Sequence, residues 1–269
     1  MSPVSVAIEN DIAVITIDNP PINATSHAVR QGIWDAIELV DRDDTIRAAI
    51  LTCAGRTFIA GADVTEFGKP PLDPILPDLI IRMEQATKPI IAAIHGTALG
   101  GGLEVALGCH YRVASETAKL GLPEVNLGLI PGAGGTQRAM RLCGLETALE
   151  MIAFGKPLSA RAARDVGLIY AVEDEPVEAA FMVNTEELQC VVPTWELPPP
   201  DMDDAAFAAV REALAKRSAG QVAPLRAVDV VETGLSMEVA DAMALERATF
   251  LEVKGGAQSS ALRHMFFSE

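Results

Sequence analysis

Short apolar runs of strand type alternate with short helix-type runs in the middle of the chain, and this alternation limits the possible folds. The strand-type runs are "IRAAILT" (46–52), "PIIAAIHG" (89–96), "YRVAS" (111–115) and "LIYAV" (168–172). The helix-type runs are "LEVALGCH" (103–110), "ETALEMIAFG" (146–155) and "SARAARDVG" (159–167). The last two end at Gly155 and Gly167, which can take the position after a helix C-cap. Repeated strand and helix units of this kind predict an α/β fold.

The N-terminal region predicts a β-hairpin followed by a helix. Alternating apolar residues in 4–8 and 12–18 indicate two strands joined at "END". Ser26 can cap a helix whose apolar face is formed by Val29, Ile33, Ile37 and Val40. The proline-containing segment 69–78 predicts irregular structure, with a helix beginning at Leu79.

The composition changes near the proline run 198–200, which is typical of a linker or a stiff crossing segment. Beyond it the pattern indicates helices over 203–218, 238–254 and 258–267. We therefore predict a core formed by residues 1–197 and a C-terminal helical region formed by residues 198–269.

The net charge of −16 disfavours nucleic acids and anionic membranes as main partners. The N-terminus lacks a signal-peptide pattern, no apolar run reaches about 18 residues, and the last residues do not form a peroxisomal address. We interpret Cys53, Cys109, Cys143 and Cys190 as reduced thiols, because none forms a C-x-x-C pair. These features predict a cytoplasmic protein.

Several common site motifs are missing from the sequence. It has no P-loop string and no G-x-S-x-G, and both "GAGGTQ" (132–137) and "GGGLEV" (100–105) fail the dinucleotide pattern at their last residue. His27, His95, His110 and His264 lack the spacing of metal ligands. We expect neither a metal nor a separate cofactor.

Two turns of small residues, "IAGAD" (59–63) and "LGGGLE" (99–104), each follow an apolar strand and precede helix-type sequence. A single turn of this kind is usually only a tight connection. Because a helix start presents free backbone NH groups, two such turns side by side can direct two NH groups at one oxygen. That arrangement is an oxyanion hole, which stabilises an enolate or a tetrahedral oxyanion.

Two glutamates lie in apolar surroundings near the second turn. Glu104 falls in the first turn of an apolar helix, where an acid also has a purely structural use beside the helix dipole. Glu124 lies in an apolar segment, and burial of a carboxyl group raises its pKa. If the two acids lie close together, they can act as an acid and a base at neutral pH. Spacing alone leaves both interpretations open.

The motifs "AGAD" (60–63), "ALGGGLE" (98–104) and "LPEVNLGLIPGAGGTQR" (122–138) resemble those of the crotonase superfamily, in particular enoyl-CoA hydratases. With "NPPINATS" (19–26) and the segment 258–269, the chain is most similar to the N-terminal hydratase/isomerase part of multifunctional fatty-acid-oxidation 3-hydroxyacyl-CoA dehydrogenases. The likeness covers nearly the whole chain, which stops where a dehydrogenase part would begin. We expect a free-standing relative or a piece of such a protein. The resemblance implies a spiral of ββα turns followed by C-terminal helices.

The resemblance also implies roles for individual residues. It identifies Glu104 and Glu124 as the catalytic pair and the NH groups of Ala62 and Gly101 as the oxyanion hole. It implies hydration of a trans-2-enoyl-CoA to a 3-hydroxyacyl-CoA, with coenzyme A as part of the substrate. The further residues expected to bind the substrate are Ala60, Asp63, Val64, Arg56, Gly100 and Gly132. Hydratases often carry a basic residue just before the segment "LNA", whereas this chain has "NPPINA" at that place. The resemblance therefore leaves open how the nucleotide part of coenzyme A would be bound.

Two other functions fit the same motifs. A Δ3,Δ2-enoyl-CoA isomerase uses the same hole and a carboxylate that moves a proton, and a non-catalytic acyl-CoA-binding protein keeps only the binding surface. The C-terminal helices of free-standing relatives build a trimer or a dimer of trimers. In multifunctional relatives they cover the chain's own active site, so a homo-oligomer and a monomer are both expected alternatives.

Overall fold

The computed structural model describes residues 2–188, 191–218 and 220–266. Two compact units make up the chain. The first unit contains Met1–Leu120 and Ser159–Thr194, and the second contains Gly121–Leu158 and Trp195–Glu269. In the described part of the chain, no helix is long and apolar enough to cross a membrane.

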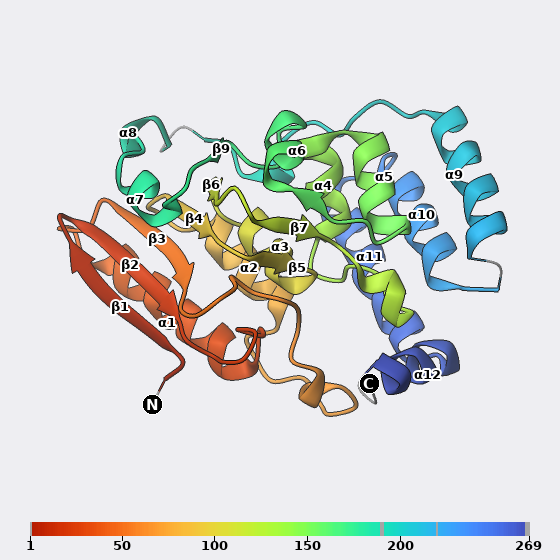
Figure 1. The fold of residues 1–269 in the computed structure, drawn as a ribbon, viewed down its shortest axis with the longest axis horizontal. Coiled ribbons are helices and arrows are strands. Elements are labelled where there is room, and N and C mark those ends of the chain that lie inside the picture. The colour runs from red at the N-terminus through yellow and green to blue at the C-terminus, as the bar shows by residue number, and fades with distance from the viewer. Residues whose placement is uncertain (1, 189–190, 219, 267–269) are drawn as a thin grey trace. The chain divides into compact units, whose positions relative to one another are not determined.

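A six-stranded sheet forms the centre of the first unit (Figure 1). Its strands, in spatial order, are β1 (Val4–Glu9), β2 (Ile12–Ile17), β3 (Ala48–Cys53), β4 (Ile90–Ile94), β6 (Tyr111–Ala114) and β9 (Ala171–Val172). The β1 and β2 strands pair antiparallel, with Val4 opposite Ile17, and all other pairs are parallel. Every residue of β3 and β4 is buried, as expected for central strands of a parallel sheet.

The first unit also contains helices. They are α1 (His27–Arg42), α2 (Leu76–Glu84), α3 (Gly101–Leu107), α6 (Ala160–Asp165), α7 (Pro176–Phe181) and α8 (Thr185–Leu188), with the 3₁₀ turn η1 (Val64–Glu66). The α1 helix packs on β1 and β2, and α7 packs on β3, β4 and β6. The strands β5 (Thr97–Leu99), β7 (Lys119–Gly121) and β8 (Leu158–Ser159) form a small second sheet in that order.

The second unit is helical. Its elements are η2 (Glu124–Leu127), α4 (Gly135–Cys143), α5 (Leu145–Ala153), α9 (Asp204–Arg217), α10 (Ala223–Gly234), α11 (Val239–Lys254) and α12 (Ala257–Phe266), and the turn η3 (Thr194–Glu196) precedes α9. The α10 helix lies at its centre, because it packs on α4, α5, α9 and α11.

Most of the predicted elements are confirmed. Asn10 and Asp11 turn the N-terminal hairpin with positive φ angles, and the Ser26 side chain accepts a hydrogen bond from the Val29 nitrogen at the start of α1. Gly155 and Gly167 follow the C-caps of α5 and α6 with φ angles of 63° and 83°. The predicted last helix extends to residue 267, which lies outside the described residues.

Two predicted elements have different bounds in the structure, and some helices were not predicted. The α2 helix begins at Leu76 rather than Leu79, because Pro77 stands in its first turn, where a missing NH costs nothing. The strand expected over 168–172 is reduced to Ala171–Val172. The α10 helix is one that was missed, because its valines have a low helix propensity and burial against neighbouring helices decides.

The compact units divide the chain differently from the predicted boundary at 197/198. Residues 121–158 pack with the C-terminal helices, because α4 and α5 bury their apolar faces against α10. The division into a core of 1–197 and a helical region of 198–269 stays a prediction.

Cys53, Cys109 and Cys143 are buried free thiols. Burial raises the pKa of Cys109 and of Cys143 to about 12, so both thiols stay protonated at neutral pH. Cys190 lies outside the described residues.

Candidate active site

The turn 59–63 leaves the sheet after β3 and is held against the second turn. Ala60 forms a parallel bridge with Leu99, and the Leu99 nitrogen donates to the carbonyl oxygen of Ile59 at 3.0 Å. The Ala60 nitrogen donates to the Ile22 carbonyl oxygen at 3.0 Å. Backbone bonds therefore fix the first turn on both sides.

The second turn leads directly into α3. Gly100 is its N-cap and has a φ of 54° and a ψ of −128°, a conformation that glycine adopts easily. A Cβ atom on Gly102 would lie only 2.0 Å from the Ile59 carbonyl oxygen. Glycine at 102 is what allows the two turns to touch.

Ala62 and Gly101 are neighbours across this contact. A Cβ atom placed on Gly101 would lie 3.9 Å from the Ala62 nitrogen. Ala62 is exposed, and Gly101 is the first residue of α3, where backbone NH groups have no partner within the helix. The predicted adjacency of the two turns is confirmed. Two backbone amides beside each other at a helix start can stabilise a developing negative charge on oxygen.

Glu104 lies in the first turn of α3, as predicted. Only 3% of its surface is exposed, and its backbone nitrogen donates to the Gly100 carbonyl oxygen at 3.0 Å. The whole of α3 is buried, so the sequence has placed a carboxylate in an otherwise apolar helix one turn after Gly101.

Glu124 begins η2 in the second unit, and its Oε2 atom is buried. Its backbone oxygen accepts from the Leu129 nitrogen at 3.0 Å, and η2 packs against α5, α10 and α12. Glu104 belongs to the first unit and Glu124 to the second, so the catalytic pair stays a prediction.

Some of the other predicted binding residues have local contacts in the structure. The Asp63 side chain accepts from the Thr65 nitrogen at 2.9 Å, and the backbone of Val64 begins η1. Arg56 is exposed. A Cβ atom on Gly132 would lie 2.5 Å from the Phe250 ring, which gives this glycine a packing role in the second unit. Binding of coenzyme A by these residues stays a prediction.

Comparison with known proteins identifies the family. The sequence matches the enoyl-CoA hydratase/isomerase family over residues 7–192. The chain belongs to this family. Its fold is the crotonase fold, and enoyl-CoA hydratase/isomerase from Pseudoalteromonas atlantica T6c superimposes with a TM-score of 0.74 at 25% identity, covering 99% of this chain and 97% of that one.

Two curated relatives show how the chain corresponds to longer and shorter proteins. It is 36% identical over 268 residues to the peroxisomal bifunctional enzyme of Danio rerio, with 97% of this chain and 37% of that enzyme aligned. It is 47% identical over 176 residues to a probable enoyl-CoA hydratase of Bacillus subtilis (strain 168), with 63% of this chain and 68% of that protein aligned. The chain thus spans little more than a third of the length of the bifunctional relative.

Sequence reasoning missed four residues that surround the two turns in this hydratase/isomerase family member. The Thr25 nitrogen donates to the Gly61 carbonyl oxygen at 3.1 Å, and Leu76 lies beside Gly101. Arg30 forms a 2.9 Å ion pair with Glu66 and donates a hydrogen bond to the Thr25 carbonyl oxygen. Arg30 stands three residues before Ile33 on the apolar face of α1, and a basic residue on an apolar face is the signal that could have found it.

The described residues contain no group of three or more His, Cys, Asp or Glu side chains placed to hold a metal ion. The His110 Nδ1 atom accepts a hydrogen bond from the Ile90 nitrogen at 3.1 Å. Burial lowers the pKa of His95, although a backbone hydrogen bond with Gly55 opposes the shift. Both histidines thus form hydrogen bonds with the backbone, as is typical of residues with a structural role.

Proposed function

We propose that the chain is an enoyl-CoA hydratase that adds water to a trans-2-enoyl-CoA and gives a 3-hydroxyacyl-CoA in fatty-acid β-oxidation. Membership of the enoyl-CoA hydratase/isomerase family supports this reaction class. The observation that carries the proposal is the contact between the two turns, where the Ala62 nitrogen lies 3.9 Å from the Cβ position of Gly101.

In the proposed mechanism, the thioester carbonyl oxygen accepts hydrogen bonds from the NH groups of Ala62 and Gly101. Addition at the β-carbon moves electrons onto that oxygen, and the two amides stabilise the resulting enolate. Ionised Glu104 removes a proton from the attacking water, and protonated Glu124 delivers a proton to the α-carbon. Since coupled carboxylates titrate as a pair, the pair as a whole supplies the acid and the base.

Coenzyme A enters this scheme as part of the substrate, and we propose no separate cofactor. Backbone atoms near Ala60, Asp63 and Val64, together with Gly100 and Gly132, would bind the thioester, and the exposed Arg56 would contact a phosphate. Arg56→Ala is expected to weaken coenzyme A binding by less than about 1 kcal/mol, because an exposed ion pair contributes little. A calorimetric titration that gives the wild-type affinity removes Arg56 from the site.

The direct test is hydration of crotonyl-CoA, followed by the loss of enoyl-thioester absorbance. Glu104→Gln and Glu124→Gln should each lower kcat by roughly 10²–10⁴-fold, the usual contribution of general acid–base catalysis. Glu116→Gln is the matched control, since this exposed glutamate pairs only at the surface with Arg161. Near-normal hydration by both active-site variants contradicts the assignment, and a wild-type protein without any activity favours a non-catalytic acyl-CoA-binding protein.

An isomerase activity is the second candidate, because the matched family includes both hydratases and isomerases. Moving a double bond between Δ3 and Δ2 needs the same hole and one carboxylate that transfers a proton. Parallel assays with 2-enoyl and 3-enoyl thioesters separate the two reactions, and a series of acyl chain lengths defines the preferred substrate.

We propose in addition that the protein is a cytoplasmic homo-oligomer, a trimer or a dimer of trimers, with a monomer as the alternative. Exposed apolar side chains on the C-terminal helices support a partner surface, including Leu225, Leu251, Met265 and Phe266. Light scattering in solution measures the assembly. Imaging of a fluorescent fusion in the source cells tests the location.

A further inference from the structure

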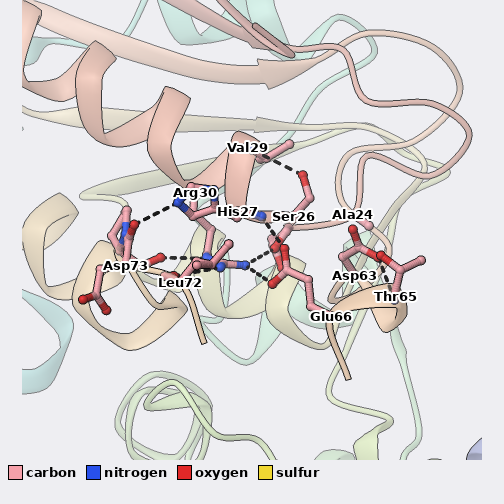
Figure 2. Close-up of polar contacts among 12 residues, drawn as sticks. Ala24, Ser26, His27, Val29, Arg30, Asp63, Thr65, Glu66, Leu72 and Asp73 are labelled. Carbon is pink, nitrogen blue, oxygen red and sulfur yellow. Dashed lines mark hydrogen bonds and ion pairs between the residues drawn. The ribbon is translucent and has the colours of Figure 1, made fainter. Parts of the chain in front are cut away.

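Arg30 is buried in the first turn of α1, and its side chain is only 7% exposed. Its Nε atom donates to the Pro74 carbonyl oxygen at 2.7 Å, and its Nη1 atom donates to the Thr25 carbonyl oxygen at 2.8 Å. Its Nη2 atom donates to the Leu72 carbonyl oxygen at 3.2 Å. Figure 2 shows Arg30 with its partners from several segments. A buried guanidinium is costly unless its donors are satisfied, so this site holds those segments in fixed places.

Glu66 is the charged partner of Arg30. Its Oε2 atom lies 2.9 Å from Arg30 Nη1, and its Oε1 atom accepts from the His27 backbone nitrogen at 2.5 Å (Figure 2). The Glu66 nitrogen donates to the Asp63 carbonyl oxygen at 3.2 Å. The pair therefore ties η1, which starts two residues after Ala62, to the N-terminus of α1.

Thr25 makes the connection on the other side of Ala62. Its carbonyl oxygen accepts from Arg30, while its nitrogen donates to the Gly61 carbonyl oxygen at 3.1 Å. Gly61 has a φ of 108°, a conformation that an ordinary side chain would not maintain. In the sequence, Ala62 thus lies between Gly61, which is bonded to Thr25, and Glu66, and both Thr25 and Glu66 are bonded to Arg30.

The third segment reaches the other turn. Leu72 and Pro74, whose carbonyl oxygens bind Arg30, lead into α2, and the Cδ2 atom of Leu76 lies 3.0 Å from the Cβ position of Gly101. Arg30 is therefore bonded to segments that touch both turns.

We propose that Arg30, through Glu66 and Thr25, positions the Ala62 amide beside that of Gly101 and so sets the strength of the hydrogen bonds to the thioester oxygen. This inference rests on the proposed hydratase function. Backbone donors stabilise a developing charge only when they are held in place before the reaction. Residues 60–62 have no side chain that can form a hydrogen bond, so they are held by backbone bonds, one of which joins Gly61 to Thr25. Arg30 is a positioning residue, because Ala62 rather than Arg30 contacts the substrate.

The test uses Arg30→Met and Glu66→Gln in the full chain. Methionine keeps an apolar stem without the donors, and glutamine keeps the shape of glutamate but cannot accept from both Arg30 and His27. Each variant should lower kcat for crotonyl-CoA by about 10- to 100-fold and change KM by less than about 3-fold, because the loss falls on charge that develops in the transition state.

A spectroscopic measurement separates positioning from a general loss of folding. Bound 4-dimethylaminocinnamoyl-CoA absorbs at longer wavelength when hydrogen bonds polarise its carbonyl, and both variants should reduce that shift. Arg82→Met is the matched control. It breaks the Arg82–Asp41 ion pair, a 2.6 Å contact in the same unit with side chains 19% and 14% exposed, and should lower the stability while leaving kcat and the shift unchanged.

Two results overturn the inference alone: wild-type kcat and shift in both variants, or an equal loss of the shift in Arg82→Met. If Arg30→Met does not fold, the milder Glu66→Gln decides. A wild-type protein that neither hydrates crotonyl-CoA nor shifts the bound probe overturns the hydratase proposal together with this inference.

Discussion

The carboxylate of Glu246 in α11 accepts a hydrogen bond from the Thr136 backbone nitrogen at 2.8 Å, in the first turn of α4. Its other oxygen accepts from the Gly134 nitrogen at 2.5 Å, and Glu246 is completely buried. A helix that starts with two glycines is intrinsically weak, and an acid from a distant helix stabilises its N-terminus.

Glu246→Ala should therefore lower the free energy of unfolding by about 3 kcal/mol, because it leaves buried backbone donors without this acceptor. Urea unfolding measures the loss. Glu252→Ala on the same helix removes an exposed partner of Arg226 and should cost less than about 1 kcal/mol. Equal losses in the two variants would show that Glu246 does not act as a buried cap.

Gly102→Ala should destabilise the contact between the two turns. The added Cβ atom would meet the Ile59 carbonyl oxygen at 2.0 Å, and a backbone atom cannot move aside as a side chain can. We expect a cost of about 3 kcal/mol or more, at the upper end of overpacking. Thermal unfolding checks this against Gly255→Ala, whose Cβ atom would have its nearest neighbour at 3.6 Å. An unchanged Tm for Gly102→Ala would rule out this close approach.

His110 should make stability depend on pH between about 7 and 4. Burial lowers its pKa from 6.5 to about 4, with a smaller contribution from the charge of Arg112. The unfolded chain therefore binds a proton at a pH where the folded protein does not, and stability falls as the pH drops below 6.5. The loss between pH 7 and pH 5 should be about 2 kcal/mol.

His110→Asn removes this titration while its amide oxygen can still accept from the Ile90 nitrogen. The difference in unfolding free energy between pH 7 and pH 5 should be smaller in the variant by that amount. An identical pH dependence in the two proteins would mean that His110 titrates normally in the folded state.

Local patterns in the sequence determined those parts of the fold that depend on near neighbours. The Ser26 cap, the hairpin turn at Asn10 and Asp11 and the place of Glu104 one turn after Gly101 all follow from residues within a few positions of one another. The sequence also predicted that the turns 59–63 and 99–104 are related, because each follows a strand and precedes helix-type residues.

Only the tertiary structure decided the relations between distant residues. The α10 helix has a poor local pattern and exists because its apolar face is buried against four other helices. The bonds of Arg30 to Glu66 and of Thr25 to Gly61 join segments about 36 residues apart, and no local propensity encodes them. The sequence by itself therefore predicted which residues could form the proposed hydratase site. The packing of the chain decided what holds the Ala62 turn. The buried guanidinium of Arg30 must be paired, and its partners come from segments that only the tertiary structure brings together.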